Sequence, residues 1–185
     1  MLGTLAPKRG WKRIVLWTLG AIVVLILAFA LRLFWQARTA LSTSDDVLDT
    51  VLPQLPSTMR PVAVLLFTKT NGFRDVAGIN AAVPALEVIA SRRGWTLYHT
   101  ENAAVFNDAQ LSRFKGTIWV NTSGNLLLPA QRAALLRFVN SGGGFVGVHG
   151  AGGDFNYDWG WYVDKLIGAQ FIGHTGIPHI QQATL

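Results

Sequence analysis

The feature that most constrains this chain of 185 residues is an uncharged apolar run of 18 residues, from Ile14 to Leu31. As a helix rising about 1.5 Å per residue, the run would span roughly 27 Å, close to the ~30 Å of bilayer hydrocarbon. A helix also satisfies its own backbone hydrogen bonds, which lipid cannot do. The run therefore predicts a transmembrane helix, which we place at residues 14–35, and about 150 residues follow it, enough for one domain.

The charges on the two sides of the run differ in sign. Residues 1–13 carry four basic side chains and no acidic one, and three aspartates follow the run at Asp45, Asp46 and Asp49. The positive-inside rule keeps residues 1–13 in the cytoplasm and exports the rest to the periplasmic or extracellular side. A signal peptide is the alternative, because Ala28-Phe29-Ala30 matches the small-x-small cleavage pattern. In that case the domain would be secreted.

The composition excludes several classes of protein. Of the formal net charge of +6, residues 1–13 contribute +4 and the remaining 172 residues only +2. The basic balance is therefore a membrane-targeting feature, and we expect no nucleic-acid partner. The chain has no cysteine, which excludes a disulfide scaffold, a cysteine-based zinc site and a cysteine nucleophile. With 50% hydrophobic and 14% charged residues, intrinsic disorder is not expected.

After the apolar run the chain divides into a connector and a domain. Residues 36–60 are polar and contain two prolines, which predicts a linker with a short helix at 46–52. Residues 61–185 alternate apolar strand patterns with helical spacing. The expected strands are 62–67, 95–100, 117–120, 145–148 and 169–172. The expected helices are 79–90, 108–115, 129–139 and 159–168. Pro84 predicts that the regular part of the first helix begins only near residue 82. This alternation predicts an α/β fold, a parallel sheet with helices on both faces.

In such a sheet, ligands bind beyond the carboxyl ends of the strands. The loops in that position are residues 68–75, 121–125, 149–162 and 173–175. They contain amides, hydroxyls, imidazoles, carboxylates, a Lys/Arg pair and several aromatic rings. Polar groups together with aromatic platforms suit a small carbohydrate, whose hydroxyls need partners and whose C–H faces stack on rings.

Four motifs occur in order: LLFTKTNGFR at 65–74, NTSG at 121–124, GGGFVGVH at 142–149 and YDWGWY at 157–162. In these motifs the chain resembles the ThuA-like, or trehalose-utilisation, family. The resemblance implies a flavodoxin-like fold related to class I glutamine amidotransferases. It also implies a role in carbohydrate utilisation, on glycosides or keto-sugars. The family domain continues past the position of Leu185, so residues 61–185 are expected to be C-terminally incomplete.

Two positions depart from the patterns that the resemblance implies. The amidotransferase relatives have a cysteine on the sharp turn where this chain has His149, so glutaminase activity is excluded. The family usually has a histidine after its Gly-Phe-Arg motif, where this chain has Asp75.

His149 and Asp154 are the candidate catalytic residues, because an imidazole moves protons near neutral pH and a carboxylate can orient it. Structural hydrogen bonding is the competing interpretation for both residues. The candidate substrate-binding residues are Lys69, Arg74, Asn121, Thr122, Tyr157, Trp159 and His174. A divalent metal on His149, Asp154 and His174 would lack tight ligand spacing, so no metal site is assigned and the cofactor stays unknown.

Three functional hypotheses follow from these residues. The first is a membrane-anchored domain that acts on or binds a sugar or keto-sugar derivative. The second is a non-catalytic glycan-binding or scaffolding module at the membrane. The third is an inactive domain fragment, which would end at an uncovered sheet edge.

Overall fold

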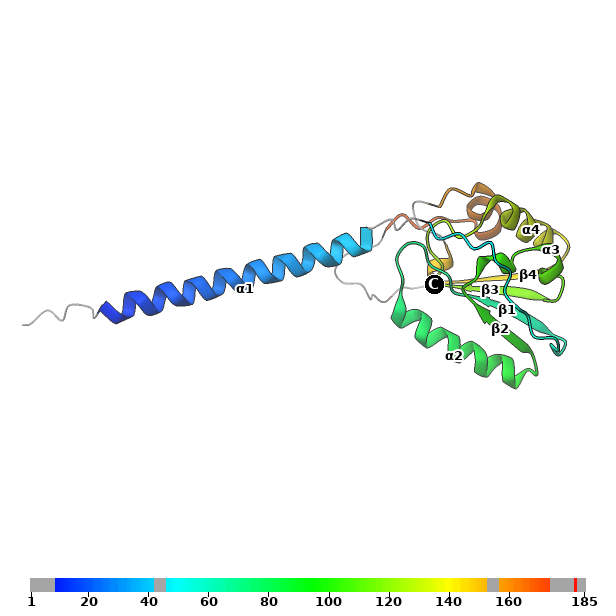
Figure 1. The fold of residues 1–185 in the computed structure, drawn as a ribbon, viewed down its shortest axis with the longest axis horizontal. Coiled ribbons are helices and arrows are strands. Elements are labelled where there is room, and N and C mark those ends of the chain that lie inside the picture. Colours follow the sequence, from blue (N-terminus) through cyan, green and yellow to red (C-terminus); the bar gives the residue numbers. More distant parts are fainter. Residues whose placement is uncertain (1–8, 42–45, 153–156, 174–181, 183–185) are drawn as a thin grey trace, which may run out of the picture. The chain divides into compact units, whose positions relative to one another are not determined.

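The computed structural model describes residues 9–41, 46–152, 157–173 and 182. The chain forms two units, Met1–Ser42 and Thr43–Leu185; the first contains the helix Arg9–Leu41 and the second contains an α/β domain (Figure 1).

Helix α1, Arg9–Leu41, contains the apolar run and extends beyond both ends of the predicted span. Its segment Gly10–Trp35 is long and apolar enough to cross a membrane, and the side chains of this segment are exposed. A signal sequence near an N-terminus would have the same length and composition. The structure therefore confirms one candidate membrane span in the described part of the chain.

The domain is built on a four-stranded parallel sheet of β1 (Ala63–Phe67), β2 (Thr96–Thr100), β3 (Gly116–Val120) and β4 (Gly144–Val148). The strand order is β2-β1-β3-β4. This arrangement confirms the expected flavodoxin-like α/β fold. The fifth strand expected at 169–172 is wrong: residues 169–173 are described without regular secondary structure, and Ile172 is 86% exposed. An apolar run becomes a strand only where a neighbouring edge pairs with it, and here the described sheet ends at β4.

Helices cover both faces of the sheet (Figure 1). Helix α2 (Val76–Arg92) lies on one face, and α3 (Asp108–Leu111) and α4 (Pro129–Asn140) lie on the other. A π-helix, Trp161–Ile167, replaces the helix expected at 159–168. Helix α2 begins six residues before the expected start near residue 82. Asp75 caps its first turn by accepting a hydrogen bond from the Gly78 amide at 2.9 Å, and Pro84 is accommodated inside the helix.

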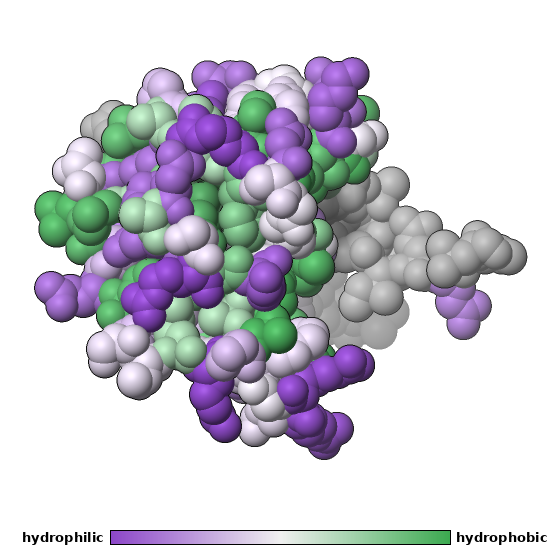
Figure 2. Space-filling model, turned by 90° about the vertical axis from the view of Figure 1, so that its right-hand side faces the viewer, coloured by the Kyte–Doolittle hydropathy of each residue, from purple (hydrophilic) through white to green (hydrophobic). Residues whose placement is uncertain are grey.

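The core on the α3–α4 face is aromatic. Phe67 meets Phe106 edge-on, with the ring centroids 4.8 Å apart, and Trp119 stacks on Tyr162 at 5.2 Å. All four rings are fully buried, and such pairs add to the stabilisation that comes from burial alone. At the end of the domain that faces the viewer in Figure 2, hydrophobic residues are interspersed with hydrophilic ones.

Residues 46–60, which we call the arm, belong to the domain and do not behave as a linker. They contain no helix, contrary to the expectation for 46–52. The arm is extended, and side chains of the domain donate hydrogen bonds to its backbone carbonyls. These bonds run from Asn71 to Val47, from Gln131 to Asp49, from Asn102 to Val51, from Gln110 to Pro53 and from Arg113 to Pro56. Their donor–acceptor distances lie between 2.6 and 3.1 Å, so the arm is held along most of its length.

Candidate functional site

Two residues with an unusual backbone conformation lie side by side at the carboxyl ends of β3 and β4. Asn121 follows β3 with φ of 49°, and His149 follows β4 with φ of 51°. Positive φ is uncommon for residues that carry a Cβ, and asparagine and histidine are among those that adopt it most readily. Such conformations cluster at functional sites. The expected sharp turn at His149 is therefore present.

The side chains of Asp75, Asn121 and His149 form a contiguous cluster, which we call the rim cluster. His149 Nδ1 lies 2.5 Å from Asn121 Oδ1. The Asn121 amide group also donates to Asp75 Oδ2 at 3.3 Å. Asp75 Oδ2 is 3.7 Å from His149 Nδ1. The His149 side chain is 73% exposed and that of Asp75 is 28% exposed. The imidazole is thus anchored on one side and open to solvent on the other.

The start of α2 places Asp75 in this cluster. One carboxylate oxygen, Oδ1, caps the helix at the Gly78 amide, and the other, Oδ2, faces Asn121 and His149. Gly78 is part of the arrangement, because a Cβ added there would collide with the Asp75 carboxylate and with the Asn121 amide. The glycine allows the helix backbone to approach the two side chains closely.

Arg74, like Asp75, lies at the edge formed by the carboxyl ends of the strands, which we call the rim. Its contacts are directed toward β2. Its Nη2 forms an ion pair with Glu101 Oε1 at 2.6 Å, and its Nη1 donates to Thr70 Oγ1 at 3.3 Å. Thr68 Oγ1 donates to the same Glu101 oxygen at 3.3 Å. The rim thus carries a second polar group of side chains beside the rim cluster, with the Arg74 guanidinium partly exposed.

The loops that follow β1 and β3 are joined by hydrogen bonds. The amides of Asn71 and Gly72 donate to the Ser123 carbonyl at 2.8 and 3.2 Å, and Ser123 Oγ donates to the Phe73 carbonyl at 2.6 Å. These bonds hold the loop that carries Arg74 and Asp75 against the loop that carries Asn121. The rim is therefore preorganised by backbone contacts.

Two of the predicted binding residues are buried away from solvent. The Lys69 side chain is 9% exposed, and its Nζ pairs with Asp49 Oδ2 of the arm at 2.8 Å. Thr122 is buried as well. In this structure, Lys69 fastens the arm to the domain.

The predicted aromatic platform is largely part of the core. Tyr157 is buried, with its ring centroid 5.0 Å from that of Tyr162. Trp159 stacks on Tyr162 at 5.6 Å and lies under the Arg132 guanidinium at 5.6 Å. Burial raises the pKa of Tyr162 above its ordinary value, and the nearby Tyr157 acts in the same direction. Of the two predicted binding residues Tyr157 and Trp159, Trp159 is the one that is partly exposed.

Asp154 and His174, the other two predicted residues, lie outside the described part of the chain. In the part that is described, no group of three or more histidine or acidic side chains is arranged to hold a metal ion.

Two acidic residues of the rim, Asp75 and Glu101, had no role predicted from the sequence. Asp75 was noted only as a departure from the family pattern, and Glu101 follows β2, whose loop was not among those considered. A signal for Asp75 was present: an aspartate directly before a helical pattern, at the end of a loop already placed on the rim.

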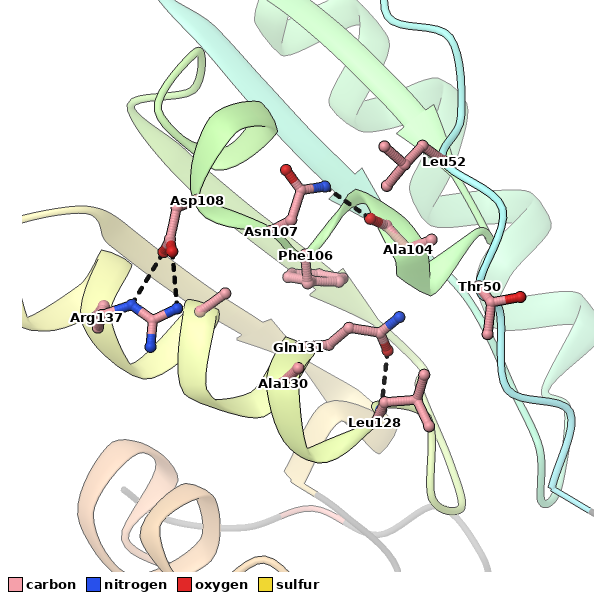
Figure 3. A pocket seen from close by; sticks show the side chains of 11 residues that line it. Thr50, Leu52, Ala104, Phe106, Asn107, Asp108, Leu128, Ala130, Gln131 and Arg137 are labelled. Atoms are coloured by element: carbon pink, nitrogen blue, oxygen red, sulfur yellow. Dashed lines mark hydrogen bonds and ion pairs between the residues drawn. The ribbon is translucent and has the colours of Figure 1, made fainter.

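A hollow of about 360 Å³ lies elsewhere, between the arm, α3 and α4 (Figure 3). The side chains of Asn107, Asp108, Gln131 and Arg137 in its lining are paired with one another or with backbone. Arg137 makes two hydrogen bonds to the Asp108 carboxylate, at 3.0 and 2.8 Å, and Gln131 accepts from the Leu128 amide. None of the predicted site residues lines this hollow, and we assign no function to it.

Comparisons with known proteins agree on one family. The family model described as ThuA, trehalose utilisation, matches residues 63–185. A solved structure of a ThuA-like protein from Bacteroides uniformis is similar, with a TM-score of 0.51 and 24% sequence identity. The match covers 66% of this chain and 50% of that chain, so the chain spans half the length of that relative. At this identity the similarity shows a shared fold. No curated protein matches the chain.

Proposed function

Since this chain belongs to the ThuA family of trehalose utilisation, we propose that its domain binds a sugar or keto-sugar derivative at the rim and acts on it by proton transfer. The observation that carries the proposal is the rim cluster, in which an exposed imidazole is anchored through one ring nitrogen beside a carboxylate. This is the arrangement that a general acid or base requires, with one ring nitrogen held and the other free to reach a substrate.

The other rim groups supply binding contacts in this proposal. Arg74 is partly exposed, and its planar guanidinium is suited to hydroxyl or carbonyl oxygens of a sugar. The partly exposed Trp159 supplies an apolar contact for the C–H groups of a pyranose. Asp154 and His174, placed near the same rim by the sequence, are proposed to assist His149.

We further propose that α1 anchors the domain to a membrane, with residues 1–13 in the cytoplasm and the domain outside it. The length and apolar character of Gly10–Trp35 support this proposal, as does the basic segment that precedes it. Extraction of membranes with alkaline carbonate tests the anchor, since an uncleaved span stays in the pellet and a secreted, processed domain is released. Protease digestion of intact spheroplasts then reports on which side the domain lies.

A panel of glycosides and 3-keto-glycosides tests the proposed chemistry on the full chain in detergent micelles. His149→Ala is expected to lose about 10²-fold or more in kcat, the usual contribution of a general acid or base. Lys115→Gln serves as the control, because Lys115 is exposed and precedes β3, at the opposite end of the sheet. Equal turnover by wild type and His149→Ala would remove His149 from the mechanism.

A non-catalytic glycan-binding module is the second candidate. It is favoured by Arg74, whose partly exposed guanidinium at the rim can bind a sugar oxygen without any chemical step. Sugar binding that survives His149→Ala and yields no product in wild type would select this candidate.

A further inference from the structure

The Asn121 side-chain amide touches three groups, and two of them have only one hydrogen-bonding role. The Gly150 amide nitrogen, 3.1 Å from Oδ1, can only donate. Asp75 Oδ2, 3.3 Å from Nδ2, belongs to a carboxylate and can only accept. These two partners lie on opposite sides of the amide.

Only one orientation of the amide satisfies both partners. With Oδ1 toward Gly150 and Nδ2 toward Asp75, each contact joins a donor to an acceptor. The flipped amide would face the Gly150 N–H with its own N–H groups and the Asp75 carboxylate with its oxygen. The backbone places the two side chains next to each other, because Asn121 and His149 follow the neighbouring strands β3 and β4, both at positive φ.

The fixed amide determines which nitrogen of His149 carries the proton. Asn121 Oδ1 is an acceptor, and it lies 2.5 Å from His149 Nδ1. Nδ1 must therefore donate. A neutral imidazole has a single N–H, so its other nitrogen, Nε2, carries the lone pair. The same Oδ1 accepts from the Gly150 amide and from His149 Nδ1, so one atom fixes both the ring and the backbone that follows it.

We infer that Asn121 is a positioning residue that holds neutral His149 in the Nδ1–H tautomer, with Asp75 fixing the Asn121 amide, so that Nε2 is the basic atom presented to a ligand. If the proposed function holds, a substrate proton moves to Nε2 while the electron pair stays on the substrate, and Nε2 later returns that proton. The imidazolium formed in between has its Nδ1–H directed at Asn121 Oδ1 and lies beside Asp75 Oδ2.

His99 provides an internal reference of the opposite kind. Its Nε2 lies 2.8 Å from Thr68 Oγ1, and the Thr68 hydroxyl donates to Glu101, whose carboxylate can only accept. With its own proton committed to Glu101, the Thr68 oxygen accepts from His99. His99 is therefore the Nε2–H tautomer, which free histidine in water also favours.

The test is a two-bond ¹H–¹⁵N correlation spectrum of the full chain, labelled with ¹⁵N-histidine, in detergent micelles. The pH is set high enough that raising it further no longer changes the spectrum. Such a spectrum distinguishes the two tautomers by their cross-peak patterns. The chain has only four histidines, and His149→Gln and His99→Gln assign the two signals. We expect the Nδ1–H pattern for His149 and the Nε2–H pattern for His99 in the same sample.

Two variants at position 121 give the inference its control. Asn121→Gly removes the amide while keeping a residue that tolerates positive φ, so His149 is expected to change to a majority of the Nε2–H tautomer. Asn121→Asp keeps an acceptor toward Nδ1 and also tolerates this conformation, so the Nδ1–H tautomer is expected to persist. His99 should keep its pattern in both variants, which separates this effect from unfolding.

An Nε2–H pattern for His149 in the wild type, or an unchanged Nδ1–H pattern in Asn121→Gly, would overturn the inference. The spectrum needs no substrate, so the inference and the proposed function fail separately. The expected tautomer without turnover of any sugar counts against the proposed function alone. Where turnover is found, Asn121→Gly is expected to lower kcat about 10²-fold with little change in KM.

Discussion

Replacing Asp49 by alanine should destabilise the α/β domain by about 3 kcal/mol, because this carboxylate joins the arm to the loops that follow β1 and β2. Asp49 Oδ2 pairs with Lys69 Nζ at 2.8 Å and accepts a hydrogen bond from the Ala103 amide, also at 2.8 Å. The substitution leaves a buried ammonium without its counter-ion, which costs about 3–5 kcal/mol in comparable cases. The orphaned Ala103 N–H adds about 1–3 kcal/mol. Asp49 itself is 24% exposed, so water recovers part of both losses.

Urea unfolding of the full chain in detergent micelles, followed by tryptophan fluorescence, measures this loss. Trp119 is fully buried in the core of the domain and reports on its unfolding. For an m-value of about 2 kcal/mol per molar urea, a loss of 3 kcal/mol lowers the midpoint by about 1.5 M. A change of this size is well outside the error of the measurement.

Three further variants separate the ion pair from other effects. Asp46→Ala removes an exposed aspartate of the same arm and should change stability by less than about 0.5 kcal/mol. Asp49→Asn keeps an oxygen acceptor for the Ala103 amide. Its loss of stability should therefore lie between the losses of Asp46→Ala and Asp49→Ala. Lys69→Met combined with Asp49→Ala should recover part of the loss, because no buried charge is left alone. If Asp49→Ala behaves like Asp46→Ala, the arm does not contribute to the folded domain and our reasoning about it is wrong.

Two other predictions concern the rim and the aromatic core. Gly78→Ala should destabilise the domain by about 1–3 kcal/mol, because the added Cβ collides with Asp75 and Asn121. Gly152→Ala, where a Cβ meets nothing within 4 Å, is its control in thermal melts, and equal melting temperatures would contradict the prediction. Tyr162 has a raised pKa in the folded state because it is buried. The unfolded chain therefore releases this proton above about pH 10 while the folded chain keeps it. Stability should accordingly be insensitive to this group below pH 10 and fall by up to about 1.4 kcal/mol per pH unit above it. Tyr162→Phe should be less stable by about 1–3 kcal/mol, since the Ala151 carbonyl loses its donor. Its urea midpoints between pH 9 and 11 should nevertheless fall less steeply, and equal slopes in both proteins would contradict the assignment.

The elements that the sequence predicted well are those whose signal is local. Strands β1, β3 and β4 follow from short apolar runs bounded by polar residues or glycine, and β1 is buried along its whole length. The start of α2 was misjudged because Pro84 was given more weight than the cap at Asp75, which is also a local signal. The fifth strand could not be excluded from the local sequence, since a strand forms only where the edge strand of a sheet is available to pair with it.

The arm shows where local reasoning ends. Its prolines and polar residues are typical of a linker, but its carbonyls accept hydrogen bonds from side chains 24 to 82 positions away in the sequence. No pattern of residues within 46–60 predicts such partners. The same limit applies to the rim: the parallel-sheet rule placed Asn121, His149 and Arg74 at one edge, but it could not say that Lys69 and Tyr157 are buried.

The arm has a practical consequence for anyone who wishes to prepare the domain without its hydrophobic helix. The family match begins at residue 63, and cutting the gene there would seem natural. A protein truncated at that point would lack Asp49 and the carbonyls that satisfy Asn102, Gln110 and Gln131. The buried Lys69 and Gln131 and the half-buried Asn102 and Gln110 would then lose these partners. A soluble version should therefore start before Asp46, so that the arm is retained in full.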